Sequence, residues 1–504
     1  MTSRKGVLVI LDGYGEAEKT VRNPSYVAYT PFLDYLKRYC PTTYIQASGE
    51  AVGVKPGQMG NSEIGHLNIG GGRVVEQMGV RITRELNNNY LAKNKKFNAL
   101  IKDTIDGKGA MHIVGLLSDI GTHAEIAHMY KLIDHAVKMN VPRVYLHLIT
   151  DGRDEETDGG LQHLIDLEQY IAPYKNVKIA SIGGRYFGMD RDKYLDRTKL
   201  AFNSMFMPNQ EVSKASAEEY LKANYKEGVS DEFIIPVRLL NDRQFKSCAN
   251  DMVVFYNFRA DRMRQICQMC IDTMPESVKL VSMTQYSEAE QFNRFFVLFP
   301  EQLIHNGLTE YLTSNGHKVL KVAETTKYAH VTYFFNGEIE KPFDGEDRVL
   351  IQGKNFKTTN IPPSMRTKEI TNAVIKGIKS NEYDLIVVNY ASPDIIGHTA
   401  DLKRCIKALE ILDVNLQKLV AKAADAGYFV AVTADHGNIE YVRDEHNKPF
   451  PAHTTNPVMF TIVDQTIPDI KMAPDGKLAD VAPTILKLMG EKPNPDFTGT
   501  PLYK

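Results

Sequence analysis

The stretch "GVLVILDGYG" at residues 6–15 decides the predicted fold, because an unbroken apolar run leads directly into Asp12. A continuous apolar run of this length is typical of a strand that is buried on both faces of a parallel sheet. Parallel sheets of this kind collect ligands at the carboxyl ends of their strands. We therefore predict a strand over residues 6–11 and a functional role for Asp12.

The same pattern recurs along the chain, with short β-branched runs alternating with longer helical patterns. This alternation indicates an α/β architecture with parallel sheets covered by helices. At 504 residues the chain exceeds what one core usually supports, so we expect roughly two to three domains and work with two. The other predicted strands are "HIVGLL" (112–117), "RVYLHLI" (143–149), "VKIASI" (177–182), "DMVVFY" (251–256), "DLIVVN" (384–389) and "YFVAVT" (428–433).

Charge and hydropathy exclude several classes of protein. The 60 Lys and Arg residues nearly balance the 62 Asp and Glu residues, which disfavours a general binder of nucleic acid or of an anionic membrane. No stretch approaches the roughly 18 apolar residues of a membrane span. The segment "MTSRKGVLVILDGYG" enters a predicted strand at once, so we expect a soluble, cytoplasmic protein.

The five cysteines are scattered and odd in number, which favours reduced thiols over a disulfide framework. Cys267 and Cys270 stand three residues apart on a predicted helix, and no second cysteine pair completes a zinc site. We therefore predict that both pack into a core. The other cysteines are Cys40, Cys248 and Cys405.

Carboxylates and imidazoles follow several of the predicted strands. "VAVTADHGN" delivers Asp435 and His436, "LIVVNYASPDIIGH" delivers Asp394 and His398, and "PAHTTNP" adds His453. Taken singly, each aspartate is more often a turn former or a helix N-cap, and each histidine a structural residue. Together they favour a pair of metal ions, which can activate a nucleophile, and the ligand types suit Mn²⁺, Zn²⁺ or Mg²⁺.

Ser62 lies in the glycine-rich stretch "GQMGNSEIGHLNIG" at residues 57–70. The glycines allow the backbone to approach a ligand, and a helix beginning near Ser62 would direct amide groups toward a phosphate. The alternative is that Ser62 merely caps this helix, with Glu63 in its first turn. A serine hydroxyl is a weak nucleophile unless a base or metal activates it, so we predict that metal coordination activates Ser62.

Arginines also follow strands in the middle of the chain. Arginine forks bind phosphate and carboxylate at two points, so convergent arginines predict a small, anionic substrate, although any one of them could form a surface salt bridge. His123 is a candidate acid or base, and Lys327 a candidate charge on a transferring phosphoryl group. The segments are "DGRDEETDGG" with Arg153 and Asp154, "GGRYFGMDRDKY" with Arg185 and Arg191, and "YNFRADRMRQ" with Arg259 and Arg262.

These motifs occur in an order that resembles the cofactor-independent (2,3-bisphosphoglycerate-independent) phosphoglycerate mutases of the alkaline phosphatase superfamily, over essentially the whole chain. The resemblance implies a discontinuous alkaline-phosphatase-like domain at 1–75 and 305–504 that binds the metals. It also implies an inserted α/β substrate-binding (transferase) domain at 76–304. The motifs are "LDGYG", "GQMGNSEIGHLNIGGGR", "DGRD", "GGRYFGMDRD", "AETTKYAHVTYFFNG", "PDIIGHT", "TADHGN" and "HTTNPV".

The resemblance also implies the chemistry. It predicts interconversion of 3-phosphoglycerate and 2-phosphoglycerate through a phosphoserine on Ser62, by a monomer with no nucleic-acid or membrane partner. Manganese is the implied metal, with magnesium or cobalt as alternatives, and no 2,3-bisphosphoglycerate is required. One metal would be held by Asp394, His398 and His453, and the other by Asp12, Ser62, Asp435 and His436. Substrate would be bound by His123, Arg153, Asp154, Arg185, Arg191, Arg259, Arg262 and Lys327.

The chain departs from the family pattern around His123, where "SDIGTHAE" replaces "SDGGVHSH", after Asp154, and over residues 344–363. Three alternatives stay open. A related metal-dependent phosphatase, phosphodiesterase or phosphopentomutase would share the metal half but lack this set of arginines. A catalytically silent scaffold protein on the same fold would be expected to have lost some of the metal-ligating residues. A bisphosphoglycerate-dependent mutase would use a phosphohistidine in an R-H-G motif near the N-terminus, which this sequence lacks.

Overall fold

The computed structural model of the protein describes residues 4–207, 210–241, 249–302, 304–353, 361–467 and 470–504. Cys248 and part of the divergent segment 344–363 lie outside these residues. The chain divides into two compact units, the first formed by Met1–Gln77 with Leu303–Lys504 and the second by Met78–Gln302. The sequence analysis placed the corresponding boundaries after residues 75 and 304. Each unit is described by itself.

One mixed sheet forms the centre of the first unit. Its strands are β1 (Gly6–Leu11), β2 (Thr42–Gln46), β10 (Val319–Glu324), β11 (Glu346–Ile351), β12 (Leu385–Tyr390), β13 (Phe429–Thr433), β14 (Val458–Val463) and β15 (Gly476–Lys477). Their order is β11-β10-β12-β1-β13-β14-β2-β15. The strands from β11 to β13 pair in parallel, so their carboxyl ends share one edge, while β14 runs antiparallel to both neighbours.

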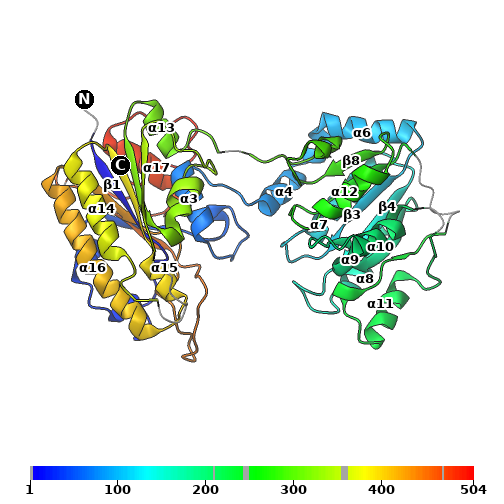
Figure 1. The fold of residues 1–504 in the computed structure, drawn as a ribbon, viewed down its shortest axis with the longest axis horizontal. Coiled ribbons are helices and arrows are strands. Elements are labelled where there is room, and N and C mark those ends of the chain that lie inside the picture. Colours follow the sequence, from blue (N-terminus) through cyan, green and yellow to red (C-terminus); the bar gives the residue numbers. More distant parts are fainter. Residues whose placement is uncertain (1–3, 208–209, 242–248, 303, 354–360, 468–469) are drawn as a thin grey trace. The chain divides into compact units, whose positions relative to one another are not determined.

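Helices cover both faces of this sheet (Figure 1). α14 and α16 pack on each other and on one face, whereas α13, α17 and α3 pack on the other. The apolar sides of strands and helices meet in one continuous core. The helices are α1 (Pro24–Val27), α2 (Pro31–Tyr39), α3 (Ser62–Gly71), α13 (Leu308–Ser314), α14 (Thr367–Ser380), α15 (Ser392–Gly397), α16 (Leu402–Asp425) and α17 (Val481–Met489).

The sequence analysis missed strand β10, which places Lys327 at the same sheet edge as Asp12. Its sequence "VLKVAE" is interrupted by Lys321, which breaks the apolar run that predicts a buried strand. In the structure Lys321 is fully buried and pairs with Glu346 on the neighbouring strand β11, at 3.4 Å between Nζ and Oε1. A charged residue is therefore tolerated inside the sheet because an adjacent strand supplies its partner.

The second unit is also a sheet covered by helices. Its strands are β3 (Met111–Leu117), β4 (Val144–Thr150), β5 (Val177–Gly184), β6 (Val237–Arg238), β7 (Met252–Phe255), β8 (Lys279–Ser282) and β9 (Phe295–Val297). They are ordered β6-β5-β4-β3-β7-β8-β9, parallel from β5 to β9. The helices are α4 (Met78–Asn87), α5 (Tyr90–Lys93), α6 (Lys95–Asp106), α7 (Ile126–Lys138), α8 (Gly160–Ile171), α9 (Arg185–Gly188), α10 (Leu195–Phe206), α11 (Ala217–Lys226) and α12 (Arg264–Thr273).

The α/β class and all seven predicted strands are confirmed, with bounds that differ by a residue or two. The prediction for the cysteine pair is also confirmed, because Cys267 and Cys270 lie on α12 and are fully buried in the core of the second unit. Within the described ranges, every helix is too short or too polar to cross a membrane.

Candidate functional site

Polar side chains converge at the carboxyl edge of the first unit's sheet, and we call this group the Ser62 cluster. Asp12 follows β1, Lys327 follows β10, Asp394 follows β12 and Asp435 follows β13. The parallel pairing of these strands brings the four side chains to one edge. The full cluster consists of Asp12, Ser62, Lys327, Asp394, His398, Asp435, His436 and His453, and all but His398 are largely buried.

Ser62 occupies the centre of the cluster. Its hydroxyl donates to Asp12 Oδ1 at 3.1 Å, lies 2.9 Å from His436 Nε2, and accepts a hydrogen bond from Lys327 Nζ at 2.6 Å. The N-cap of α3 is Asn61, whose side chain accepts from the Ile64 amide at 2.9 Å. The alternative that Ser62 serves as the cap is therefore wrong, and its hydroxyl is left to face the cluster.

Two glycines beside Ser62 let other parts of the protein backbone approach closely. A Cβ at Gly65 would lie 2.6 Å from the carbonyl oxygen of Asp435, and one at Gly60 would lie 2.2 Å from the carbonyl oxygen of Ala47. Real side chains do not fit at such distances. The glycine-rich stretch therefore allows α3 to pack directly against the loop that carries Asp435.

Asp394 forms the second half of the cluster. Its Oδ2 accepts from Lys327 Nζ at 2.7 Å, while Oδ1 lies 3.2 Å from His398 Nε2 and 3.3 Å from His453 Nε2. The Nδ1 atoms of the two histidines lie 2.7 Å from Pro451 O and 2.9 Å from Gly60 O. In the neutral imidazoles these carbonyl contacts favour a proton on Nδ1, so that each Nε2 lone pair can bind a cation shared with Asp394.

The charges of the cluster are unbalanced, since three buried carboxylates face one lysine. Burial and the neighbouring Asp435 raise the pKa of Asp12. Burial alone would lower the pKa of Lys327, but Asp12 and Asp394 outweigh it and raise that pKa. A hydrogen bond with Asp394 likewise raises the pKa of His398. The cluster thus attracts cations, whether protons or metal ions.

Arginines converge at the carboxyl edge of the second unit's sheet. Arg185, at the start of α9, is buried and donates from Nη1 to Asp151 Oδ1 at 2.5 Å and to Asp154 Oδ2 at 2.6 Å. His123 Nε2 lies 3.7 Å from Asp154 Oδ2. We use the name arginine cluster for His123, Arg153, Asp154, Arg185, Arg191, Arg259 and Arg262.

Asp261 links other members of the arginine cluster. Its carboxylate lies 2.7 Å from Arg191 Nη1 and 3.1 Å from Arg259 Nε. Arg262 donates to the carbonyl oxygen of Met189 at 3.2 Å. Arg153 makes the longest ion pair of these arginines, at 3.7 Å to Glu232 Oε1, and half of its side chain is exposed. The structure thus brings the predicted arginines to one sheet edge, and adds Asp151 and Asp261, which the sequence analysis missed.

The arginines suppress the charge of the histidine among them. Burial, followed by the charge of Arg185, lowers the pKa of His123 to about 4. Burial would raise the pKa of Asp154, but the hydrogen bond from Arg185 outweighs it and lowers that pKa. At neutral pH the cluster therefore presents arginine cations, a neutral imidazole and ionised carboxylates.

Comparisons with known proteins identify the family of this chain. A model of the Metalloenzyme superfamily matches residues 4–493. A 2,3-bisphosphoglycerate-independent phosphoglycerate mutase from Synechocystis sp. is 40% identical over 98% of this chain and 95% of the relative, and one from Clostridium novyi is 39% identical over the whole of both. The chain belongs to the 2,3-bisphosphoglycerate-independent phosphoglycerate mutase family. A Leishmania mexicana phosphoglycerate mutase crystallised at low cobalt concentration aligns with a TM-score of 0.59 at 28% identity, covering 100% of this chain and 98% of that one.

The Ser62 cluster fits the divalent metals that a phosphoglycerate mutase of this superfamily implies. Its ligand types are carboxylate oxygen and imidazole nitrogen, with no thiolate. Asp394, His436 and His453 place one ligand atom each within 4.8 Å of one another. Asp435 Oδ2 is buried and makes no regular hydrogen bond to a described residue, its nearest ring nitrogen being His66 Nδ1 at 3.3 Å, and such an oxygen favours a bound cation.

Two residues beside the cluster escaped the sequence analysis. His66 Nδ1 lies 3.3 Å from Asp435 Oδ2, and Asn389 Nδ2 donates to Asp12 Oδ2 at 2.6 Å. These two side chains also contact each other, at 3.0 Å between Asn389 Nδ2 and His66 Nε2. The positions of both residues in the sequence could have indicated that they lie near the site. His66 stands four residues after Ser62, on the same face of α3, and Asn389 is near the carboxyl end of β12.

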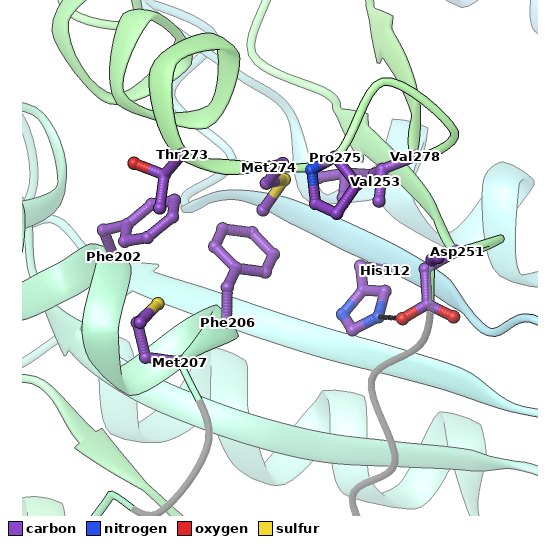
Figure 2. Close-up of a pocket in the computed structure, with 11 residues that line it drawn as sticks. His112, Phe202, Phe206, Met207, Asp251, Val253, Thr273, Met274, Pro275 and Val278 are labelled. Carbon is purple, nitrogen blue, oxygen red and sulfur yellow. Dashed lines mark hydrogen bonds and ion pairs between the residues drawn. The ribbon is translucent and has the colours of Figure 1, made fainter.

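A separate cavity of about 250 Å³ lies at the amino ends of β3 and β7, the opposite sheet edge from the arginine cluster. Figure 2 shows His112 and Asp251 paired at its polar end, 3.3 Å apart between Nε2 and Oδ2. The chain of contacts continues from His112 to His147 at 2.9 Å and from His147 to Ser181 at 2.8 Å. Because these groups satisfy one another, we interpret them as structural. The apolar wall includes Phe202, Phe206, Met207, Val253, Met274, Pro275 and Val278.

Proposed function

We propose that this member of the mutase family interconverts 3-phosphoglycerate and 2-phosphoglycerate, with Ser62 as the phosphoryl acceptor. The observation that carries the proposal is the position of Ser62 Oγ, which lies within 3.1 Å of Asp12, His436 and Lys327 in a buried cluster. A serine needs such surroundings to act as a nucleophile at neutral pH. The identity of the relatives, which are named as phosphoglycerate mutases, supports the choice of substrate.

Two divalent ions complete the proposed site. One would be held by Asp394, His398 and His453, and the other by Asp12, Ser62, Asp435 and His436. When bound, such ions lower the pKa of a coordinated hydroxyl and offset negative charge on phosphoryl oxygens. Manganese is the proposed ion, with magnesium or cobalt as alternatives. Manganese and the monomeric state are supported by the family resemblance, and the cytoplasmic location by the sequence pattern.

The phosphoryl group moves in two balanced steps. In the first, a bond forms between Ser62 Oγ and phosphorus while the bond from phosphorus to the 3-oxygen breaks, and the hydroxyl proton of Ser62 ends on that oxygen. In the second, a bond forms between the 2-oxygen of glycerate and phosphorus while the bond from phosphorus to Ser62 Oγ breaks, and Ser62 Oγ takes up a proton in place of the one that the 2-hydroxyl gives up. Lys327 Nζ, 2.6 Å from Ser62 Oγ, stabilises the negative charge that develops in both steps.

The arginine cluster is proposed to bind the glycerate part of the substrate. The guanidinium groups of Arg191, Arg259 and Arg262 match the carboxylate and hydroxyl oxygens of glycerate. Asp154, whose pKa is lowered by Arg185, is the proposed acceptor of the 2-hydroxyl proton, and the neutral His123 lies beside it. Retaining glycerate distinguishes a mutase from a phosphatase, since loss of glycerate would expose the phosphoserine to water.

Replacement of Ser62 tests the proposal. We expect Ser62→Ala to lower kcat at least about 1,000-fold, because no other hydroxyl in the cluster can accept the phosphoryl group. The assay supplies 3-phosphoglycerate and manganese without 2,3-bisphosphoglycerate and measures 2-phosphoglycerate. Mass spectrometry of the quenched wild-type enzyme should find phosphate on the peptide that contains Ser62.

Ser380→Ala is the matched control, because that hydroxyl donates only to Gly377 O at the end of α14. It should retain wild-type activity. Substantial mutase activity in Ser62→Ala would exclude Ser62 as the nucleophile. A requirement for added 2,3-bisphosphoglycerate would instead favour the phosphohistidine class, and release of free glycerate with inorganic phosphate would favour a phosphatase.

A further inference from the structure

Glu440 is a fully buried carboxylate in the loop that follows β13, shortly after Asp435 and His436. It faces four neutral hydrogen-bond donors. Oε2 accepts from the backbone amides of Gly15 at 3.0 Å and Asn438 at 2.8 Å. Oε1 accepts from Asn456 Nδ2 at 3.0 Å and from the hydroxyl of Thr454. No ion pair to Glu440 is found among the residues that the structure describes.

The four donors belong to three chain segments that are distant in sequence. Gly15 lies three residues after Asp12, Asn438 lies two residues after His436, and Thr454 directly follows His453. Each segment therefore carries a proposed metal ligand within three residues of an atom that binds Glu440. One carboxylate thus holds together three loops that each carry a ligand of a proposed metal site.

Two glycines leave the space that the Glu440 carboxylate occupies. A Cβ at Gly15 would lie 2.5 Å from Glu440 Cδ, and a Cβ at Gly437 would lie 2.4 Å from Glu440 Oε1. Any larger residue at either position would push the carboxylate away. A backbone bridge between Gly437 and Thr454 further joins two of the loops, with the Thr454 amide 2.9 Å from Gly437 O.

We infer that Glu440 is a positioning residue for the metal ligands, setting the spacing of Asp12, His436 and His453 without touching the reacting atoms. This inference rests on the proposed metal-dependent function. Groups that orient metal ligands from behind typically contribute 10- to 100-fold to metal affinity or activity. A buried carboxylate suits the task because it accepts from all four donors at once.

The two oxygens of the Glu440 carboxylate differ in which chemical groups could take their place. The amides of Gly15 and Asn438 can only donate, so the atom that faces them must be an acceptor. The hydroxyl of Thr454 can rotate and the amide of Asn456 can flip, so both can face a donor instead. Glu440→Gln can therefore keep its carbonyl toward Gly15 and Asn438, whereas Glu440→Leu leaves all four donors without an acceptor.

The experiment measures manganese affinity by isothermal titration calorimetry on the full chain without substrate, well below the unfolding temperature of each variant. We expect the dissociation constant to rise about 10-fold in Glu440→Gln and about 100-fold in Glu440→Leu. Steady-state assays should show a lower kcat at saturating manganese with an unchanged KM for 3-phosphoglycerate, because the arginine cluster is untouched. If the leucine variant does not fold, the glutamine variant still decides the question.

Asp413→Asn is the matched control. Asp413 is a buried carboxylate on α16 that accepts from the Leu33 amide at 2.7 Å and the Phe32 amide at 3.2 Å, and it contacts no residue of the Ser62 cluster. The control should lose thermal stability but keep its manganese affinity. The inference is overturned if Glu440→Gln binds manganese as the wild type does, or if Asp413→Asn weakens binding equally. A wild type that binds no manganese would overturn the proposed metal sites themselves.

Discussion

The Ser62 cluster and the arginine cluster stand at equivalent places in two α/β units, the carboxyl edge of a parallel sheet, yet their charges are opposite. In the first, three buried carboxylates face a single lysine, and His436 and Asp435 are completely buried. In the second, arginines outnumber the carboxylates that pair with them, and Arg153, Arg191 and Arg259 are about half exposed.

The difference shows how one architecture serves two kinds of ligand. Buried carboxylates without enough cations are costly, so we expect metal ions to complete the Ser62 cluster. Exposed guanidinium groups remain hydrated and can exchange water for the oxygens of an anion. The parallel sheet thus brings the side chains together at its carboxyl edge, and their charge and burial decide whether they bind a cation or an anion.

Removal of metal should give the largest effect and should act on the first unit alone. Chelation is expected to lower activity at least about 1,000-fold, with recovery when manganese is added, because Ser62 loses its activation. Hydrogen exchange read by mass spectrometry should show weaker amide protection in Ser62–Gly71 and unchanged protection in Val177–Gly184. Equal loss of protection in both segments, or activity that is unchanged by the chelator, would contradict the conclusion that metal ions act on the first unit alone.

Substitution of Arg185 should give the next largest effect, confined to the second unit. Arg185→Lys keeps the charge but shortens the side chain whose Nη1 joins Asp151 and Asp154, so we expect kcat/KM to fall about 100-fold. Arg153→Lys is the control within the same cluster and should fall less than about 10-fold, because that side chain is half exposed. Manganese affinity should be unchanged in both, and a loss of affinity in Arg185→Lys would contradict the separation of roles.

The protonation of His123 should give the smallest effect. Its pKa is lowered to about 4 in the folded protein, so the folded state binds fewer protons than the unfolded state between pH 4 and the ordinary imidazole value. Stability contributed by neutral His123 is therefore complete above the ordinary value near 6.5 and is lost as pH falls toward 4, by about 2 kcal/mol at pH 5.

Urea unfolding of the wild type and of His123→Gln at pH 7.5, 6 and 5 measures this effect as a difference between the two proteins. The wild type should lose more stability than the variant as the pH falls. A stability difference that is the same at all three pH values would show that burial and the arginines do not lower the pKa of His123.

Much of the fold could be predicted because local pattern and burial agree in the central strands. The apolar runs ending at Asp12 and Thr433 are strands in the structure, and the two-unit organisation followed from chain length and motif order. β10 could not be predicted in this way, because Lys321 breaks its apolar run and is accommodated by Asn336 and by Glu346 from another strand, both distant in sequence.

By itself the sequence determined the residue types at the strand ends, the α/β class and the resemblance to the mutase family, since each depends on local pattern and order along the chain. Only the tertiary structure decided that Asn61 rather than Ser62 caps α3, that the glycines admit Asp435, and that Glu440 joins three loops. The physical reason is that hydrogen bonds and close packing between distant segments depend on three-dimensional position, which no local pattern encodes.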